Sequence, residues 1–522
     1  MSYRQGIAMR STKARMTVVT AAALAVYFAA LAGPALAAAG DVKNGEAVYM
    51  KRCWWCHGKE GEADGPGADF MIPPPRNFAD GVYKYKSAGP DSDLPRDEDI
   101  FRMISDGMPG TSMPSWKETL SEKDRWDLVA FLKTLSDMFE DEPNPKEMSY
   151  GTPVASSAES IAKGKQLFKD AKCFECHGEG GKGNTIKKLK EESGAKLWPR
   201  NLTQPWTFRS GTDPKDIFAR ITSGIPNTPM PAHAADQTGA GKLSVEDRWH
   251  VVNYVMSLAD HRMETKEGEI VVKGVYRETL PKDENDPAWD IAEGTAFFLV
   301  PQIIQDERIF DPSNGSILMK ATFTDKEVAF LLEWDDRTHS VKGDANAANL
   351  AWGDLGPDAV AIQTPLDVDN LASGKPYFGH GDASRPVSMM YWNSGDTENG
   401  QSGAMFSAIG SGTKDASDTA AAGFTATGSY DAGTWKVMMR RNLVTDAKDK
   451  DTQFAAGKYI PIAFANWDGS NGEAGSKHTM TTWRWLLLKP ETGSAVVVYP
   501  LMVFVLLVAG QFIFSMVGRK ED

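Results

Sequence analysis

Cysteine is scarce in this chain: the 522 residues include only 4, and all of them lie in two short motifs. If those motifs use all four, none remains for an iron–sulfur cluster, which cysteine thiolates hold. Excess basic charge is also lacking, because 70 acidic residues outnumber 57 basic ones and the net charge is −13. Such a surface repels nucleic acid and suits a basic protein partner or none in particular. The sequence therefore excludes a nucleic-acid partner.

The length and composition predict several folded domains. A chain of 522 residues is too long for a single hydrophobic core, and length alone suggests about three or four domains. Its content of 41% hydrophobic and 24% charged residues is that of a folded protein.

Residues 1–39 are predicted to be a secretory signal peptide. A basic stretch ends at Arg15, residues 16–32 are uncharged and apolar, and Ala35-Leu36-Ala37 fits a small-residue cleavage site. An uncleaved membrane anchor is the alternative, because the apolar run is slightly long for a signal. The chain would be exported with either a signal peptide or an uncleaved anchor.

A single C-terminal transmembrane helix is expected over residues 494–518. Residues 492–518 carry no charge, and a helix needs about 20 apolar residues to cross a bilayer. Arg519 and Lys520 follow directly and would hold the tail in the cytoplasm. A buried core helix is the alternative. With this anchor, the body of the protein would lie on the periplasmic side of the bacterial cytoplasmic membrane.

The two cysteine motifs have the form Cys-x-x-Cys-His, which is the attachment signal for c-type haem. Two thiols must reach the two vinyl groups of one porphyrin, and the adjacent histidine must then lie beneath the iron as its proximal ligand. The first motif is Cys53, Cys56 and His57; the second is Cys173, Cys176 and His177. An exported dithiol–disulfide pair and half of a zinc site are the alternatives. Two such motifs in an exported chain favour haem.

The surroundings of the two motifs form an internal repeat with an offset of about 120 residues. Each repeat contains a Thr-x-Met-Pro run and ends with a serine that opens a helix-capping sequence. The matching segments are 44–49 with 163–168, 99–109 with 216–226, 111–114 with 228–231, and 121–126 with 244–249.

These repeats resemble class I cytochrome c domains, over about 100 residues each. The resemblance implies that the methionine of the Met-Pro pair is the distal iron ligand, which places that role on Met113 and Met230. Met108 competes with Met113, but the second repeat has Ile225 at the matching position. An iron with His and Met on its two axial positions is closed to substrate, which favours electron transfer over catalysis.

Two all-α cytochrome c domains are therefore expected at residues 40–140 and 161–262, joined by a proline-containing linker at 141–160. From about residue 269 the pattern changes to strand-like runs separated by Gly, Asp and Asn turns, which predicts an all-β sandwich over 268–490. Residues 400–433, rich in Gly, Ala, Ser and Thr, are expected to form a long loop. The runs are 269–276, 316–324, 327–334, 359–363, 387–392, 434–440, 459–467 and 482–488.

Several short motifs in this third region resemble the haem b-binding γ subunit of ethylbenzene dehydrogenase and related periplasmic molybdenum enzymes. They are residues 286–290 (DPAWD), 330–336 (FLLEWDD), 376–382 (PYFGHGD), 385–387 (RPV), 467–473 (WDGSNGE) and the pair Thr482-Trp483.

The resemblance also implies the ligands of a b haem, which that family holds between a methionine and a lysine. The corresponding positions here carry His380 and His478. Imidazole can replace either ligand, so we expect a bis-histidine b haem. Lys477, beside His478, is an alternative second ligand. Two surface histidines without a haem are the remaining alternative.

The resulting hypothesis is a membrane-anchored periplasmic electron-transfer subunit that carries two c haems and one b haem and is not an enzyme by itself. It would connect the iron–sulfur and molybdenum subunits of an oxidoreductase, such as a nitrite- or nitrate-type enzyme, to periplasmic or membrane electron carriers. A self-contained redox enzyme such as a dihaem peroxidase is one rival, but it would need a five-coordinate haem. The other rival is a dihaem cytochrome with a carbohydrate- or ligand-binding β-sandwich. Such a sandwich would bind sugar with exposed tryptophans.

Overall fold

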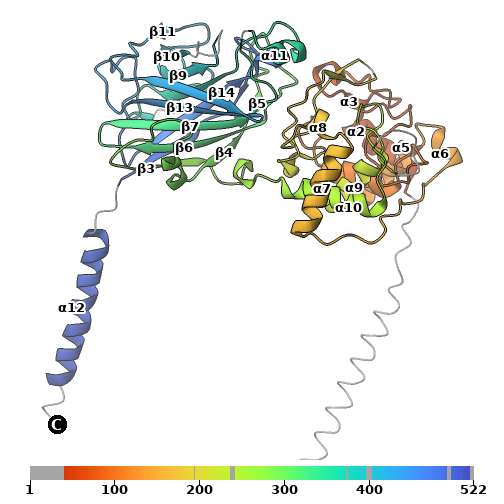
Figure 1. Cartoon of the computed structure of the whole chain (residues 1–522), viewed down its shortest axis with the longest axis horizontal. Coiled ribbons are helices and arrows are strands. Elements are labelled where there is room, and N and C mark those ends of the chain that lie inside the picture. The colour runs from red at the N-terminus through yellow and green to blue at the C-terminus, as the bar shows by residue number, and fades with distance from the viewer. Residues whose placement is uncertain are drawn as a thin grey trace, which may run out of the picture.

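The computed structural model describes residues 40–192, 194–234, 241–341, 343–371, 374–395, 402–490 and 495–517. Two helical units, a β-rich unit and one separate helix follow one another along the chain (Figure 1). The predicted signal peptide at 1–39 lies outside the described residues. The predicted domain limits stay predictions.

The first helical unit surrounds the first cysteine motif. Its core contains Tyr49 from α2, Ile100 from α4 and Leu128 from α5, each at most 2% exposed. Its elements are α2 (Val42–Arg52), α3 (Trp54–His57), η1 (Ala68–Phe70), α4 (Asp97–Asp106), α5 (Glu122–Lys133) and α6 (Met138–Asp141).

The second helical unit repeats this arrangement around Phe168, Phe218 and Val252. It adds a two-stranded pairing of β1 with β2. Its elements are α7 (Ala158–Asp170), α8 (Phe174–His177), β1 (Leu189–Lys190), β2 (Lys196–Leu197), η2 (Pro205–Thr207), α9 (Pro214–Ser223) and α10 (Val245–Ser257).

A glycine sets the helix crossing in each unit. A Cβ on Gly45 would lie 2.1 Å from the Asp127 carbonyl oxygen, and one on Gly164 would lie 2.0 Å from the His250 carbonyl oxygen. No other residue lets the backbones of α2 and α5, or of α7 and α10, approach so closely. The repeated glycine of the sequence is therefore a packing requirement.

The predicted caps of α5 and α10 are confirmed. Ser121 accepts a hydrogen bond from the Asp124 amide, and Ser244 accepts one from the Asp247 amide, both at 3.1 Å. In each case the acidic side chain accepts a bond back from the serine hydroxyl. These bonds satisfy amide groups that a helix start would otherwise leave unpaired.

The β unit is one hydrogen-bonded path of strands, in the order β11-β10-β9-β8-β14-β16-β3-β6-β7-β13-β12, with β4, β5 and β15 off the path. After η3 (His261–Met263), its elements are β3 (Val271–Tyr276), η4 (Pro287–Ile291), β4 (Thr295–Phe298), β5 (Val300–Pro301), β6 (Ser316–Phe323), β7 (Glu327–Asp335), α11 (Ala345–Leu350), β8 (Ala359–Pro365), β9 (Val387–Asn393), β10 (Ser402–Ala408), β11 (Asp415–Ala416), β12 (Thr425–Asp431), β13 (Thr434–Asn442), β14 (Tyr459–Trp467), η6 (Gly469–Asn471), β15 (Thr479–Met480) and β16 (Arg484–Lys489).

This path folds over so that its two halves face each other. The first half of β14 pairs with β16, and the second half pairs with β8. Across the core, Trp392 of β9 lies against Trp334 of β7 and Trp435 of β13, at ring-centroid distances of 6.2 and 5.0 Å. Alternation along β7 sends Phe330 and its even-numbered neighbours into this core and Leu331 to the opposite face.

A strand lies at each of the eight runs that the sequence predicts. The prediction of a long loop at 400–433 is wrong. That segment contains β10, β11 and β12, and β10 pairs with β9 along its whole length. Its small residues fit there because strands of the facing half of the sheet supply bulky groups. A Cβ on Gly428 of β12, for example, would lie 2.5 Å from the Trp392 ring.

The expectation that the C-terminal helix spans a membrane is also wrong. A helix, α12 (Ala495–Val517), forms at the predicted position and stands apart from the β unit (Figure 1). Within the described part of the chain, no helix is long and apolar enough to cross a membrane.

Candidate haem sites

The first cysteine motif forms a single helical turn at the wall of a cavity. The amide of His57 donates to the Cys53 carbonyl at 3.0 Å, which places Cys53, Cys56 and His57 on the same cavity. Met113 and Met108 also line this cavity. The structure thus brings together both thiols, the histidine and both candidate distal ligands of the first predicted c-haem site.

The ring of His57 is held in the orientation that a metal ligand needs. Its Nδ1 lies 3.0 Å from the Arg76 carbonyl oxygen, which can only accept, so Nδ1 carries the proton and Nε2 keeps its lone pair. Phe78 stacks on the ring at 4.5 Å. Burial lowers the pKa of His57 below its usual value, which keeps the imidazole neutral as iron ligation requires.

The second motif repeats this geometry. The amide of His177 donates to the Cys173 carbonyl at 2.9 Å, and its Nδ1 lies 3.0 Å from the Arg200 carbonyl oxygen. Burial lowers the pKa of His177 in the same way. Sequence reasoning missed these carbonyl partners, although Pro-Arg-Asn occurs at 75–77 and again at 199–201.

The loops that carry the candidate distal methionines are also alike. The Met113 carbonyl accepts from the Met108 amide, and the Met230 carbonyl accepts from the Ile225 amide, both at 3.1 Å. A threonine hydroxyl, from Thr111 or Thr228, accepts from the methionine amide in each loop. Met113 therefore corresponds to Met230, and Met108 corresponds to Ile225.

The four thiols are poorly suited to a redox dithiol. Burial raises the pKa of Cys53 to about 12 and that of Cys173 to about 11, whereas a reactive dithiol needs a lowered thiol pKa. Among the described residues, no cysteine belongs to a group of three potential metal ligands, which argues against the zinc alternative.

His380 and His478 line one cavity of about 430 Å³ in the β unit, a size typical of ligand pockets. His380 lies in a tight turn at φ +73°, and its amide donates to the Gln363 side chain at 3.2 Å. The Nδ1 of His478 lies 3.1 Å from the Thr479 carbonyl oxygen, which again leaves Nε2 with its lone pair. Burial lowers the pKa of His478 to about 4.

The remainder of this cavity is largely apolar and aromatic, as a porphyrin requires. The described lining includes His478 but not Lys477, whose ammonium group pairs with Glu307 at 2.8 Å. Its aromatic and methionine side chains are Tyr377, Phe378, Met389, Tyr391, Phe406, Phe464, Trp467 and Met480.

Two partly buried arginines at the junction of the units would supply charge for haem propionates. Arg209, from the second helical unit, lines the cavity of the first, and its Nε has no hydrogen-bond partner among the described residues. Arg200 is also partly buried, and desolvation together with the neighbouring Arg209 and Arg337 lowers its pKa to about 10. Buried guanidinium groups that repel one another are costly unless an anion joins them. The donor set therefore fits a propionate-bearing group.

The three units contact one another in the order of the chain. Arg102 of the first pairs with Asp216 of the second. Asp335, at the end of β7, accepts hydrogen bonds from Asn201 at 2.8 Å and Gln204 at 3.0 Å and pairs with Lys182 at 3.2 Å. The second helical unit is thus in contact with both others.

Comparison with known proteins identifies the units. The cytochrome c family matches residues 42–136 and 161–259, and the ethylbenzene dehydrogenase family matches residues 416–479, which include His478 but not His380.

A curated relative from Haloferax mediterranei, described as a putative respiratory nitrate reductase heme subunit, is 27% identical over 216 residues, or 41% of this chain and 71% of its own. A chain of the reducing HAO-like protein complex of Kuenenia stuttgartiensis is 36% identical, with a TM-score of 0.39, over 42% of this chain and 96% of that one. A family 9 carbohydrate-binding module from Caldicellulosiruptor kristjanssonii is 13% identical, with a TM-score of 0.26, over 43% and 97%. Neither TM-score supports an inference about function.

The cytochrome c matches indicate haem c, and the ethylbenzene dehydrogenase match suggests haem b. The chain joins two domains of the cytochrome c family to a domain of the ethylbenzene dehydrogenase family.

Proposed function

We propose that this chain is a periplasmic electron-transfer subunit with two c haems and one b haem, which serves a molybdenum oxidoreductase of the nitrate or nitrite type. Haem supplies reversible one-electron storage at iron. The chain's own residues would hold the iron, and burial favours the neutral, ligand-competent form of His57, His177 and His478.

The ligand positions support electron transfer rather than catalysis. Met113 shares a cavity with His57, and Met230 occupies the equivalent loop of the second domain. In the β domain, His380 and His478 share a cavity. Two protein ligands at each iron would leave no open position for substrate. Lys477 is less suited as a ligand because it pairs with Glu307.

The observation that carries the proposal is the short segment 198–201 of the second cytochrome c domain. The Arg200 carbonyl holds the ring of His177, while its neighbours contact the β domain: Trp198 donates to Asn471 at 3.3 Å, and Asn201 donates to Asp335 at 2.8 Å. The chain then runs from Asn471 to His478 at the other cavity. Covalent structure and hydrogen bonds thus connect two predicted ligand sets directly.

The expected partners are iron–sulfur and molybdenum subunits on one side and periplasmic electron carriers on the other. The Haloferax relative is described as a nitrate reductase heme subunit, and the ethylbenzene dehydrogenase match points to the same class of enzyme. All four cysteines lie in the haem-attachment motifs, so an iron–sulfur cluster must come from another chain. The export that we propose is supported by the apolar run at 16–32 and by the two haem-attachment motifs.

The carbohydrate-binding alternative finds less support in the β domain. A sugar platform would use exposed tryptophans, but among the described residues of this domain no tryptophan is exposed. Trp334, Trp392 and Trp435 are each at most 1% exposed and form its core.

Haem counting tests the cofactor part of the proposal. Acid–acetone should extract one haem from the purified full chain and leave two attached. His380→Ala should weaken or abolish the extractable haem, whereas His380→Met, which supplies another iron ligand, should retain it and raise its potential. His261→Ala is the matched control, because His261 is an exposed histidine that pairs with Glu264. A wild-type chain with only two haems, both covalent, would refute the b-haem site.

Purification of the native assembly tests the partner part. We expect a chain with iron–sulfur clusters and a chain with molybdenum to copurify, and reduced enzyme to transfer electrons to the haems of this chain. If the chain purifies with three haems but without molybdenum under mild conditions, the electron-transfer assignment stands and the partner assignment fails.

A further inference from the structure

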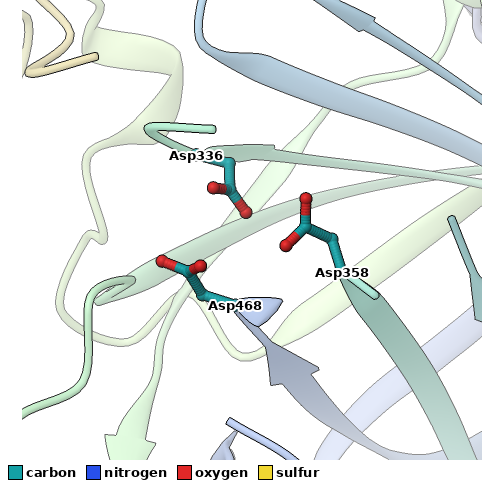
Figure 2. Close-up of side chains that lie close together, drawn as sticks. All are labelled: Asp336, Asp358 and Asp468. Carbon is teal, nitrogen blue, oxygen red and sulfur yellow. The ribbon is translucent and has the colours of Figure 1, made fainter. Parts of the chain in front are cut away.

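Three aspartates form a buried cluster in the β domain, apart from the cavity of His380 and His478. Asp336, Asp358 and Asp468 are 5%, 0% and 1% exposed, and each offers an oxygen within 4.8 Å of the others. Their carboxyl groups converge on a common point in Figure 2. Among the described residues, this is the one group of three acidic, histidine or cysteine side chains with that geometry.

The cluster is assembled from three strand ends. Asp336 directly follows β7, Asp358 directly precedes β8, and Asp468 directly follows β14. These positions lie up to 132 residues apart in sequence, and only the folding of the sheet brings them together. None of the three lines the cavity that contains the two histidines.

Hydrogen bonds satisfy most oxygens of the cluster but leave one without a partner. Asp358 accepts from the Ser340 and Gly469 amides and the Trp435 indole, at 2.8 to 2.9 Å. Asp468 Oδ1 accepts from the Ser470 amide and hydroxyl and the Asn471 amide. Asp468 Oδ2 is fully buried and has no partner among the described residues. A native fold rarely leaves a buried carboxylate oxygen in this state.

The charges around the cluster do not balance either. Glu473 adds a fourth buried acid, whereas the cation that faces them is Arg337, which stacks on Trp198 at 4.6 Å. Burial, with repulsion from the neighbouring acids, raises the pKa of Asp336 and Asp358 well above its usual value. Burial and Asp468 raise the pKa of Glu473 to about 8. Burial without a further positive charge therefore disfavours the charged form of these carboxyl groups.

We infer that Asp336, Asp358 and Asp468 bind one hard divalent cation of the Ca²⁺ class. The donor set contains only oxygen, which selects Ca²⁺, Mg²⁺ or Mn²⁺ over softer metals. Two opposite ligands of Ca²⁺ lie about 4.6 to 5.2 Å apart, since each Ca–O distance is about 2.3 to 2.6 Å. The oxygens of the three aspartates all lie within 4.8 Å of one another, which is compatible with ligands of one such ion. The cation would also provide the missing partner for Asp468 Oδ2.

Such a cation would stabilise the surface on which the second cytochrome c domain docks. Asp335, next to Asp336, accepts the hydrogen bonds of Asn201 and Gln204. Asn471, three residues after Asp468, accepts those of Lys196 and Trp198. One ion would thus fix both loops that hold the two domains together. The cation site is independent of the proposed electron-transfer function, because haem content does not depend on it.

Metal analysis and thermal unfolding of the full haem-loaded chain test the inference. We expect one calcium per chain after dialysis without chelator. EGTA should lower the Tm of the β domain by several degrees, and added CaCl₂ should restore it, because a ligand of the folded state stabilises it. MgCl₂ at the same concentration should restore less. A chain with no bound calcium and the same Tm in EGTA and CaCl₂ would overturn the proposal.

Two variants separate a cation from protonated acids. Asp358→Asn should weaken calcium binding by at least about tenfold, the lower end of the cost of losing a supporting group at a metal site. Asp451→Asn is the matched control, since Asp451 is also 1% exposed but lies outside the cluster, and its calcium response should equal that of the wild type. If Asp358→Asn folds with an unchanged calcium response, the cluster holds protons and the proposal fails. If Asp358→Asn does not fold, the wild-type measurements decide.

Discussion

The two cytochrome c domains are nearly the same locally and differ in their surroundings. In both, an arginine stacks on a phenylalanine at 4.8 Å: Arg125 of α5 on Phe101, and Arg248 of α10 on Phe218. Among the described residues, the ion pair of Arg102 with Asp216 joins the first domain to the second, and Trp55 of its cysteine motif is 56% exposed. The second domain contacts a neighbour on each side. The repeated sequence therefore sets the surroundings of each cysteine motif, and the position along the chain sets the place of each domain in the proposed electron path.

Removal of either cysteine pair should have the largest effect. Cys53→Ala with Cys56→Ala, or Cys173→Ala with Cys176→Ala, should each abolish one covalent haem, because the thioether bonds are lost. Haem staining of denatured protein and its intact mass measure this loss. The second pair should also interrupt electron exchange between the β domain and the first domain. An unchanged haem stain would refute the attachment sites.

Replacement of the distal methionines should come next. The iron–sulfur bond gives ferric His/Met haem a weak absorption near the red edge of the spectrum, so Met113→Ala and Met230→Ala should each reduce this band by roughly half while the haem is retained. Met108→Ala is the matched control and should leave the band unchanged. The opposite result for Met108 and Met113 would show that the two domains differ in their ligands.

Asp335→Ala should affect the second domain and spare the first. It removes the hydrogen bonds from Asn201 and Gln204 and the ion pair with Lys182, at a cost of about 1.5 to 3 kcal/mol for each charged hydrogen bond. Calorimetry should show earlier separation of the β domain, and stopped-flow reduction should show slower exchange with the second c haem. Asp325→Ala, on the exposed β6–β7 turn, is the control. Equal rates in both variants would contradict the docking path.

The helix-crossing glycines test whether the two domains pack alike. Gly45→Ala and Gly164→Ala should each lower the free energy of unfolding by about 1 to 3 kcal/mol, because the new methyl group meets a carbonyl oxygen. Gly89→Ala and Gly180→Ala place the methyl group in open space and serve as controls in each domain. Chemical denaturation of the four variants measures the difference, and equal stabilities would show that the helices can separate without cost.

The smallest effects are expected at the helix caps. Ser121→Ala and Ser244→Ala should each cost about 0.5 to 2 kcal/mol, because the amides of Asp124 and Asp247 lose their acceptor. Asparagine at the same positions should restore most of the stability. A clear difference between the two serines in thermal unfolding would show that docking, rather than the cap, holds one of the helices.

Sequence patterns predicted much of the fold because most of the evidence was local. Ser121 and Ser244 cap helices as the sequence indicated, and the strand-like runs of the third region form strands. Residues 400–433 were misassigned because Gly and Ala have low strand propensity by themselves, yet Gly428 is required beside the large Trp392 ring. The transmembrane prediction rested on hydrophobicity alone, and the described part of α12 does not support it.

The sequence by itself determined the two cysteine–histidine motifs, since covalent attachment of one porphyrin requires both thiols and the histidine within five residues. It also determined the equivalence of Met113 and Met230 through the repeat. Only the tertiary structure decided which carbonyl orients each histidine, that His380 and His478 share one cavity, and that Asp336, Asp358 and Asp468 meet. The physical reason is that non-covalent sites require proximity in space alone. In this protein the packing and docking of the sheet provide that proximity.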